Sequence, residues 1–363
     1  MSGLKRRIIE VITTVGPIPA SEYMALCLFD PEAGYYTTRE PFGRGGDFIT
    51  APEVSQMFGE LVAVWCYEAW RAIGSPMPVT LAEIGPGRGT LMKDMLRTLQ
   101  RLDPVFATGA SIALIETSPR LREVQKNTLN GMAAGVEWHE TTATLLDQPL
   151  LIVGNELFDA VPVRQFVRTA DGWRERMVGL DATGELAFFA GAASLDPALL
   201  PRDAEGALNG AIVELAPARS ALMQAIADRV AAHGGAGLFF DYGHLKPGVG
   251  DTLQALRNHQ YEDVLASPGD ADLTAHVDFA ALAASARTAG LRADCRTQGS
   301  FLLAMGLLER AGHLGANADE ATRERLAGEV ERLAGPRAMG ELFKVLAIAP
   351  EQIVLPVFRD RDG

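Results

Sequence analysis

The chain has 363 residues, of which 48% are hydrophobic, and its formal charge at pH 7 is −13. This length exceeds that of one small domain, and the apolar content is ample for a buried core. The acidic balance argues against a broad nucleic-acid-binding surface, and no apolar run approaches the length of about 18 residues that a membrane-spanning helix needs.

The first 75 residues precede the first predicted core strand and predict a helical region. Its opening residues predict one helix, and residues 21–29 predict a second, shorter helix. The stretch "PFGRGGDFIT" (41–50) predicts a glycine-rich loop. After it, Thr50 and Glu53 fit a capping box that opens one long helix ending near Gly74.

The middle of the chain alternates apolar runs with helical patterns, which is typical of a parallel sheet covered on both faces. The predicted strands are 79–85, 111–116, 135–140, 150–156, 237–243 and 343–350. Residues 163–215 instead predict short antiparallel strands with turns at Asp171-Gly172 and Thr183-Gly184.

These patterns divide the chain into four segments. We expect a helical or lid region (1–75), a first part of the core (76–162), an antiparallel β insertion (163–215) and a second part of the core (216–363). Within the last segment, residues 251–310 are expected on the substrate side. The cysteines have no metal or redox spacing, which indicates a reduced compartment: Cys27, Cys66 and Cys295.

The stretch "LAEIGPGRGT" (81–90) carries a glycine loop whose spacing is G-x-G-x-G. A dinucleotide fingerprint would be G-x-G-x-x-G, so a different nucleotide is indicated. Glycines permit positive φ angles and a close backbone approach, and Glu116, at the end of the next strand, can accept hydrogen bonds from ribose hydroxyls. Together with Glu83 before the loop, this pattern is typical of Rossmann-like methyltransferases that use S-adenosylmethionine. The predicted cofactor-binding residues are Glu83, Gly85, Pro86, Gly87, Gly89 and Glu116.

Polar residues follow the fourth predicted strand, where ligands bind in such folds. Asn155, Glu156 and Asp159 are predicted to face the methyl acceptor, although Asn155 and Glu156 also fit a helix start as N-cap and dipole partner. Two carboxylates beside Phe158 would suit a planar guanidinium, which offers up to five donors. Methyl transfer to arginine needs alignment and a later proton acceptor, which carboxylates can supply.

Three further stretches leave two interpretations open. In "FFDYGH" (239–244), the polar side chains either line the acceptor pocket or belong to a turn and a surface loop: Asp241, Tyr242 and His244. In 268–279, the acidic residues and a histidine match no metal pattern; Asp272 or Thr274 is expected to cap a helix and the others to border the substrate groove: Asp270, His276 and Asp278. Aromatic residues around Gly43–Gly46 form either a lid or core packing: Tyr35, Tyr36, Phe42 and Phe48.

Several stretches, in order along nearly the whole chain, resemble the MidA family, whose mitochondrial members are the arginine methyltransferase known as complex I assembly factor 7. They are "GDFITAPEVSQMFGELVAVW", "EIGPGRGTLMKDMLR", "GNELFDAVPVRQF", "FFDYGH", "ASPGDADLTAHVDF" and "MGELFKVLA". The resemblance implies S-adenosylmethionine as cofactor and, for the mitochondrial members, an arginine on an NADH dehydrogenase subunit as substrate. The predicted fold class is therefore α/β, a Rossmann-like class I methyltransferase core with a mostly parallel seven-stranded sheet, an N-terminal helical extension and the antiparallel insertion.

The predicted function is methyl transfer from S-adenosylmethionine to an arginine of a protein, with no metal and no nucleic-acid partner. A small-molecule methyltransferase and a non-catalytic assembly factor for a respiratory complex stay open as alternatives, and a homodimer is an open option. With 28 Arg against 5 Lys and family-like sequence from the first turns, we expect a bacterial cytoplasmic protein. The mitochondrial matrix would apply only if a presequence had been removed.

Overall fold

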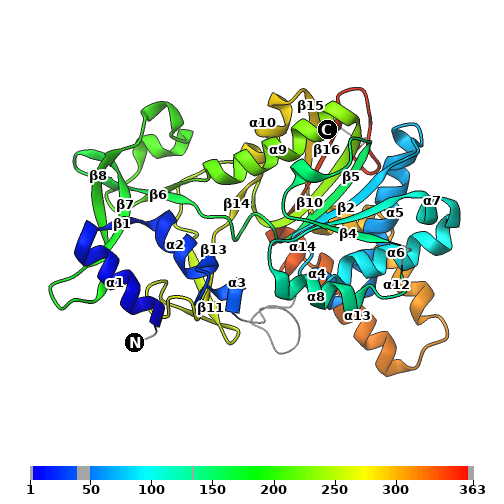
Figure 1. Cartoon of the computed structure of the whole chain (residues 1–363), viewed down its shortest axis with the longest axis horizontal. Helices are drawn as coiled ribbons and strands as arrows, with labels where there is room; N and C mark the ends of the chain where they lie inside the picture. Colours follow the sequence, from blue (N-terminus) through cyan, green and yellow to red (C-terminus); the bar gives the residue numbers. More distant parts are fainter. Residues whose placement is uncertain (1–2, 39–49, 133–134, 359–363) are drawn as a thin grey trace. The chain divides into compact units, whose positions relative to one another are not determined.

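The structure is a computed structural model that describes residues 3–38, 50–132 and 135–358 (Figure 1). Contacts between residues divide the chain into two compact units. Unit 1 comprises residues 1–48, 158–220 and 246–277, and unit 2 comprises residues 49–157, 221–245 and 278–363. Each unit thus collects separate stretches of chain, whereas the segments predicted from the sequence run consecutively; the predicted boundaries after residues 75, 162 and 215 stay a prediction.

Unit 2 contains the sheet that the strand pattern predicts. Its main path has the strand order β15-β16-β10-β5-β2-β3-β4. Strands β10, β5, β2, β3 and β4 pair in parallel, while β16 is antiparallel to both β10 and β15. The mostly parallel α/β fold is confirmed. The bounds are β2 (Thr80–Ile84), β3 (Ser111–Ile115), β4 (Val136–His139), β5 (Leu150–Asn155), β10 (Gly235–His244), β15 (Leu291–Thr297) and β16 (Phe343–Pro350).

Strand β15 is not among the strands predicted from the sequence. It lies at the end of the strand order and pairs only with β16 along this path. In its sequence "LRADCRT", only the first and third residues, Leu291 and Ala293, are buried, and the other five are partly exposed. Four of those five are charged or polar: Arg292, Asp294, Arg296 and Thr297. An edge strand buries less than a central one, so its sequence carries a weaker apolar signal.

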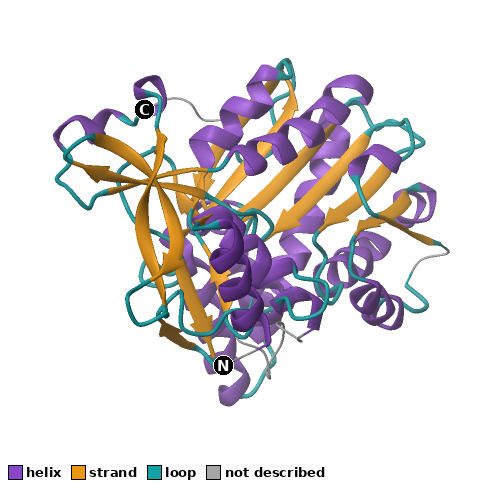
Figure 2. Ribbon diagram, turned by 60° about the vertical axis from the view of Figure 1, so that its left-hand side comes forward, coloured by secondary structure: helices purple, strands orange, loops and turns teal. Residues whose placement is uncertain are grey.

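Helices lie on both faces of the unit 2 sheet (Figures 1 and 2). One face is covered by α5 and α6, whose apolar side chains share a core with alternating strand residues such as Leu151, Val153, Leu238 and Phe240. The bounds are α4 (Ala51–Val54), α5 (Gln56–Ala72), α6 (Thr90–Leu102), α7 (Pro104–Gly109), α8 (Pro119–Thr128), η1 (Thr142–Thr144), α9 (Pro217–His233, beginning in unit 1), α10 (Phe279–Thr288), α11 (Gln298–Ala304), α12 (Leu307–Gly315), α13 (Glu320–Ala334) and α14 (Met339–Leu342).

The prediction of one long helix beginning at Thr50 is wrong in two respects, the capping box and the continuity of the helix. Thr50 does occupy the N-cap position of α4, but its side chain makes no capping hydrogen bond. Glu53 does not complete a capping box through its side chain, because its Oε1 accepts from the Thr90 hydroxyl at 2.9 Å. The helix also breaks at Ser55, whose extended backbone ends α4 and whose side chain accepts from the Met57 amide to start α5.

Unit 1 is built from two antiparallel sheets and the N-terminal helices. The larger sheet has the order β1-β7-β6-β9, with β8 paired to β7, and the smaller one has the order β12-β11-β13. The antiparallel strands expected within 163–215 are therefore present. The bounds are α1 (Gly3–Val15), β1 (Ile18–Pro19), α2 (Ala20–Phe29), α3 (Tyr35–Thr38), β6 (Arg164–Thr169), β7 (Gly172–Leu180), β8 (Leu186–Ser194), η2 (Pro197–Leu199), η3 (Arg202–Gly206), β9 (Ile212–Leu215), β11 (Gln254–Arg257), β12 (Gln260–Glu262) and β13 (Asp272–Thr274), with β14 (Val277–Asp278) at the boundary of the units.

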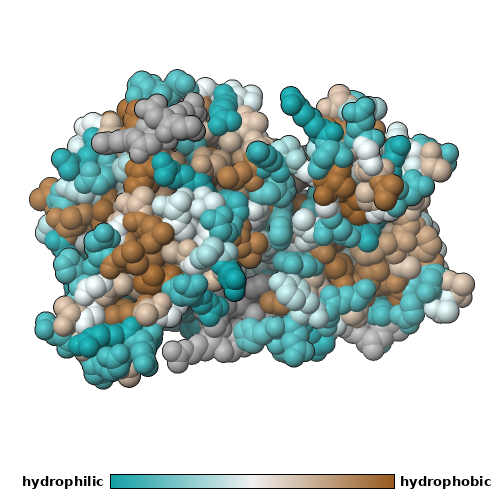
Figure 3. Space-filling model, turned by 180° about the vertical axis from the view of Figure 1, so that it is seen from behind, coloured by the Kyte–Doolittle hydropathy of each residue, from teal (hydrophilic) through white to brown (hydrophobic). Residues whose placement is uncertain are grey.

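The core of unit 1 joins residues that are distant in sequence. Ile8 of α1 and Met24 of α2 share one hydrophobic cluster with Leu253 and Leu273, and a second cluster surrounds Phe166. On the face of the molecule drawn in Figure 3, hydrophobic residues form separate patches among hydrophilic ones. No helix among the described residues is long and apolar enough to cross a membrane.

Candidate cofactor and acceptor site

The glycine loop (residues 85–89) connects β2 to α6 in unit 2. Its three glycines all have positive φ, of 67° at Gly85, 51° at Gly87 and 80° at Gly89. Gly89 is the N-cap of α6, and its amide donates to the Pro86 carbonyl at 2.7 Å. A Cβ at Gly85 would lie 3.1 Å from Leu157 Cδ1, so the loop leaves little room for a side chain. A backbone free of side chains fits the close approach of a nucleoside cofactor.

Glu83 lies beneath this loop rather than at the surface. Its side chain is almost fully buried, and Oε2 accepts a hydrogen bond from the Met92 amide in the first turn of α6 at 3.1 Å. Burial raises the pKa of Glu83 to about 8, and the Met92 hydrogen bond only partly opposes that shift. Glu83 therefore ties β2 to α6; its direct contact with the cofactor stays a prediction.

Glu116 follows β3, as the ribose-binding prediction requires. Its Oε1 accepts from the Ser118 amide at 2.8 Å and its Oε2 from the Gln125 amide at 3.1 Å. Burial raises the pKa of Glu116, while these two hydrogen bonds act in the opposite direction. Each carboxylate oxygen has a second lone pair, so the group retains acceptor capacity for a diol.

Gln125 is a residue of this region that the sequence reasoning missed. It lies on α8, and its amide contacts both the glycine loop and Glu116. The only signal in the sequence is its spacing: Gln125 is four residues after Leu121, and these are the two buried residues of α8. A polar residue on the apolar face of a helix calls for a partner.

The carboxyl end of β5 carries Asn155 and Glu156. Asn155 Nδ2 donates to Glu156 Oε1 at 3.0 Å, and Asn155 Oδ1 is buried with no hydrogen-bond partner among the described residues. Glu156 has a φ of 52°, which non-glycine residues rarely adopt, and its amide donates to the Phe240 carbonyl at 2.8 Å. Residues 156–163 form bends and turns, not a helix, so the interpretation of Asn155 and Glu156 as a helix start is wrong.

Asp159 belongs to unit 1 and is nearly fully buried. Its Oδ1 accepts from the Ala160 amide at 2.8 Å, and its carbonyl accepts from the Ala275 amide at 3.2 Å and from Arg219 Nη2 at 3.0 Å. The same arginine donates to the carbonyls of Val161 and His276 at 2.9 and 2.7 Å. Arg219 thus joins the segment after β5 to the segment after β13.

The structure decides some of the interpretations left open for residues 239–244 and 268–279. Asp241 lies inside β10 and is fully buried, with Oδ1 accepting from the Tyr242 amide at 3.0 Å, so it does not cap a turn. His244 ends the same strand, and its Nδ1 is buried with no hydrogen-bond partner within the described part of the chain. The expected helix cap at Asp272 or Thr274 is wrong, because both lie in β13; Asp278 caps α10 by accepting from the Ala281 amide.

The aromatic residues of the expected lid are described only in part. Tyr35 is fully buried, and Tyr36 donates its hydroxyl to Asp272 Oδ2 at 3.0 Å, so both belong to the packing of unit 1. Phe42, Phe48 and Gly43–Gly46 lie outside the described residues. In the ranges that the structure describes, no group of three or more His, Cys, Asp or Glu side chains could hold a metal ion.

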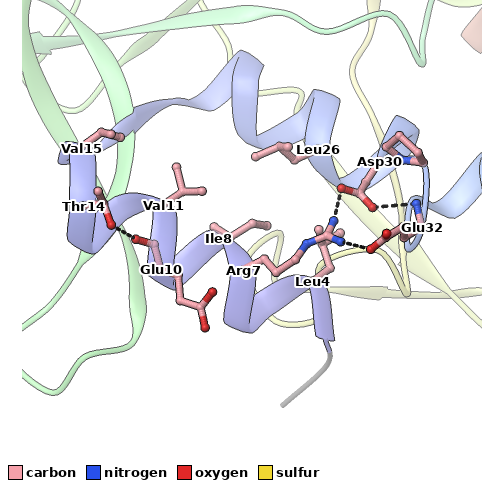
Figure 4. A pocket seen from close by; sticks show the side chains of 11 residues that line it. Leu4, Arg7, Ile8, Glu10, Val11, Thr14, Val15, Leu26, Asp30 and Glu32 are labelled. Carbon is pink, nitrogen blue, oxygen red and sulfur yellow. Dashed lines mark hydrogen bonds and ion pairs between the residues drawn. The ribbon is translucent and has the colours of Figure 1, made fainter.

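A pocket of about 690 Å³ lies along α1 and α2 in unit 1 (Figure 4). Apolar side chains such as Ile8 and Leu26 line it, and Arg7 forms ion pairs there with Asp30 and Glu32. None of the predicted cofactor or acceptor residues lines this pocket. It therefore contributes nothing to the site built on the glycine loop.

Comparisons with known proteins agree with the predicted cofactor and fold. A family model described as "Putative S-adenosyl-L-methionine-dependent methyltransferase" matches residues 61–297. "Protein arginine methyltransferase NDUFAF7, mitochondrial" of Danio rerio is 37% identical, over 95% of this chain and 86% of that protein. The Homo sapiens protein of that name is 34% identical, over 96% of this chain and 83% of that protein.

Among solved structures, the chain is similar to a protein of Burkholderia thailandensis described as a "likely methyl transferase", which was crystallised bound to S-adenosyl-homocysteine. The two structures superimpose with a TM-score of 0.84 and 30% sequence identity, covering 99% of this chain and 95% of that chain. These matches confirm the cofactor and the fold predicted from the glycine spacing, and the predicted resemblance extends over nearly the whole chain. The chain belongs to this family of S-adenosylmethionine-dependent methyltransferases.

Proposed function

We propose that this methyltransferase acts on an arginine side chain of a protein. The observation that carries the proposal is the pair of acceptors at the end of β5. Asn155 Oδ1 is buried and has no hydrogen-bond partner within the described ranges, and the Glu156 carboxylate lies beside it. An acceptor atom buried without a partner is costly unless a ligand supplies the donor. The relatives named as protein arginine methyltransferases support the same acceptor class.

The end of β5 lies against the glycine loop. Gly154 is paired with Ile84 of β2, and the Leu157 side chain is the group that a Cβ at Gly85 would meet. When bound at that loop, S-adenosylmethionine supplies a methyl group activated by its sulfonium sulfur. This neighbourhood of β5 and the glycine loop supports the proposal that Asn155 and Glu156 meet the acceptor nitrogen.

The chemistry of these side chains suits a guanidinium. A guanidinium has five N–H donors and no acceptor, so an amide oxygen and a carboxylate can both receive its hydrogen bonds. Glu156 would orient the cation, balance its charge and accept the proton that leaves the nitrogen after transfer. We include Asp159 in this role because of its place three residues further along the chain; it belongs to unit 1.

The proposed partner and the proposed compartment rest on different observations. We take a subunit of respiratory NADH dehydrogenase as the first substrate to examine, because the resemblance to the MidA family implies it. We propose the cytoplasm of a bacterium as the compartment, because 28 Arg against 5 Lys is typical of a protein from a GC-rich bacterial genome.

The test is single-turnover transfer from labelled S-adenosylmethionine into protein extract from cells that lack this enzyme, followed by amino-acid analysis. Methylated arginine is expected with the wild type. Glu156→Gln should lower the transfer rate about 10- to 100-fold, because a hydrogen bond to a charged group contributes about 1.5–3 kcal/mol. Its affinity for S-adenosylhomocysteine should stay within about threefold.

Glu140→Gln is the matched control, since this carboxylate follows β4 in the same unit and 75% of its side chain is exposed. It should leave both quantities unchanged. Label in a small molecule, or in a residue other than arginine, would contradict the proposed acceptor. An unaltered transfer rate in Glu156→Gln would remove this carboxylate from the site.

A further inference from the structure

Gln125 is a fully buried polar residue on α8 in unit 2, with 0% of its surface exposed. Burying an amide is unfavourable unless its donors and its acceptor are all hydrogen-bonded. The amide meets this demand with three partners from three different parts of the chain: Gly87 in the glycine loop, Glu116 after β3 and Trp138 in β4.

The orientation of the amide follows from the chemistry of Trp138. The indole Nε1–H can only donate, and it lies 2.9 Å from Gln125 Oε1. The oxygen must therefore face the indole, and Nε2 must face the other side. From there Nε2 donates to the Gly87 carbonyl at 2.8 Å and to Glu116 Oε2 at 3.1 Å. Both donors and the acceptor are used.

The loop also packs directly on this side chain. A Cβ at Gly89 would lie 3.6 Å from Gln125 Cγ and 3.7 Å from its Cα, so the helix approaches the loop closely at this residue. Glu116 is held from a second direction by the Ser118 amide. Movement of the loop away from Glu116 would have to break at least one of the hydrogen bonds of Gln125.

We propose that Gln125 is a positioning residue for S-adenosylmethionine: its amide holds the glycine loop and the Glu116 carboxylate in one fixed relation. These are the two parts of the chain predicted to contact the nucleoside. A preorganised pair binds a ligand more tightly than a mobile one, because less ordering accompanies binding. The inference concerns the cofactor and is independent of the proposed arginine acceptor.

Gln125→Met tests the proposal, because methionine has a similar length but neither amide donors nor an amide acceptor. Equilibrium dialysis with labelled S-adenosylhomocysteine should show a dissociation constant raised about tenfold to a hundredfold, the range expected when a hydrogen bond to a charged group is lost. Gln125→Asn is the second variant; it keeps the amide but is one methylene shorter, and it should also weaken binding. It serves alone if Gln125→Met does not fold.

Gln148 provides a matched control in the same sheet. Its Nε2 donates to Thr80 Oγ1 at 2.8 Å and to Ser111 Oγ at 3.3 Å, and these residues begin β2 and β3. Gln148→Met therefore removes a bridging amide at the opposite ends of the two strands. It should lower the melting temperature as Gln125→Met does, while cofactor affinity stays within about twofold.

A double-mutant cycle separates positioning from general packing. In a Glu116→Ala background, Gln125→Met should weaken binding by less than about threefold, because the two side chains act as one unit. Trp138→Phe removes only the indole donor and should have a smaller effect than Gln125→Met. Unaltered affinity in Gln125→Met, equal weakening in Gln148→Met, or additive effects in the cycle would each overturn the proposal.

Discussion

Among single residues, Glu83 shows how burial changes a carboxyl group. It is 3% exposed, with its hydrogen bond to the Met92 amide insufficient to offset desolvation, so its pKa rises to about 8. In the unfolded chain the group titrates near its ordinary value. Between these two values the folded protein binds one proton more than the unfolded protein, and folding stability falls as pH rises.

Glu83→Gln should remove this dependence. The amide oxygen can still accept from Met92, but it does not titrate. We expect the free energy of unfolding of the variant, relative to wild type, to increase from pH 5 to pH 8 by at most about 5 kcal/mol. Urea unfolding of both cofactor-free proteins across this range measures the difference. Parallel curves would mean that Glu83 is ionised in the folded state.

Local spacing accounts for the residues that could be predicted. The positions of Glu83, Gly85 and Glu116 follow from one strand, one loop and the end of the next strand, and the structure places each there. Gln125 could not be identified this way. Its partners Gly87 and Trp138 are 38 and 13 residues away, and no motif joins them.

At the level of elements, the position of the glycine loop after its strand was predicted closely, whereas the helix before that strand was not. Residues 50–72 have an apolar face of helical period, and this favours one continuous helix. The break arises at Ser55, whose extended φ and ψ of −158° and 140° end one helix and whose hydroxyl caps the next. Side-chain periodicity continues across such a break and does not reveal it.

Gly85→Val tests whether the glycine loop binds the cofactor. A β-branched residue is strained at a φ of 67°, and its Cβ would meet Leu157 Cδ1 at 3.1 Å. Wild-type protein should melt at a higher temperature with S-adenosylhomocysteine and at an unchanged temperature with NAD. Gly85→Val should fold and lose the shift with S-adenosylhomocysteine.

Gly74→Val separates backbone strain from crowding of the loop. Gly74 has a φ of 94° in the same unit, but nothing lies within 4 Å of the position of its Cβ. Its variant should lose a similar amount of stability and keep the full ligand-induced shift. A retained shift in Gly85→Val, or a shift of wild type with NAD alone, would contradict the assignment of the loop.

For the whole molecule, the predicted site residues do not all belong to one unit. All six predicted cofactor residues belong to unit 2, together with Asn155 and Glu156, while Asp159 belongs to unit 1. The sequence could not show this division, because unit 1 brings Ile8 and Leu273 into one core from stretches more than 200 residues apart. Hydrophobic patterning identifies elements, but it does not identify which distant elements share a core.

A substitution of Arg219 tests whether the unit 1 segment that carries Asp159 contributes to methyl transfer. The residue is 2% exposed, and its guanidinium donates to four carbonyls of unit 1: those of Asp159, Val161, Ala275 and His276. Lysine carries its donors on a single nitrogen and does not reproduce the planar fork that spans these carbonyls. In Arg219→Lys the segment that carries Asp159 should therefore lose its fixed position, although the charge is kept.

If Asp159 acts on the acceptor, Arg219→Lys should lower single-turnover methyl transfer by at least about tenfold, since displacement of a catalytic group by about 1 Å can cost a hundredfold. The dissociation constant for S-adenosylhomocysteine should stay within about threefold, because the predicted cofactor residues belong to unit 2. Arg174→Lys is the control: its Nη1 donates to the Ala192 carbonyl at 3.0 Å at the surface of unit 1, and neither quantity should change. Transfer at the wild-type rate in Arg219→Lys would show that the position of the Asp159 segment does not limit the reaction. Equal losses of transfer and cofactor affinity would show that Arg219 supports cofactor binding as well, and the role given to Asp159 at the acceptor alone would then be wrong.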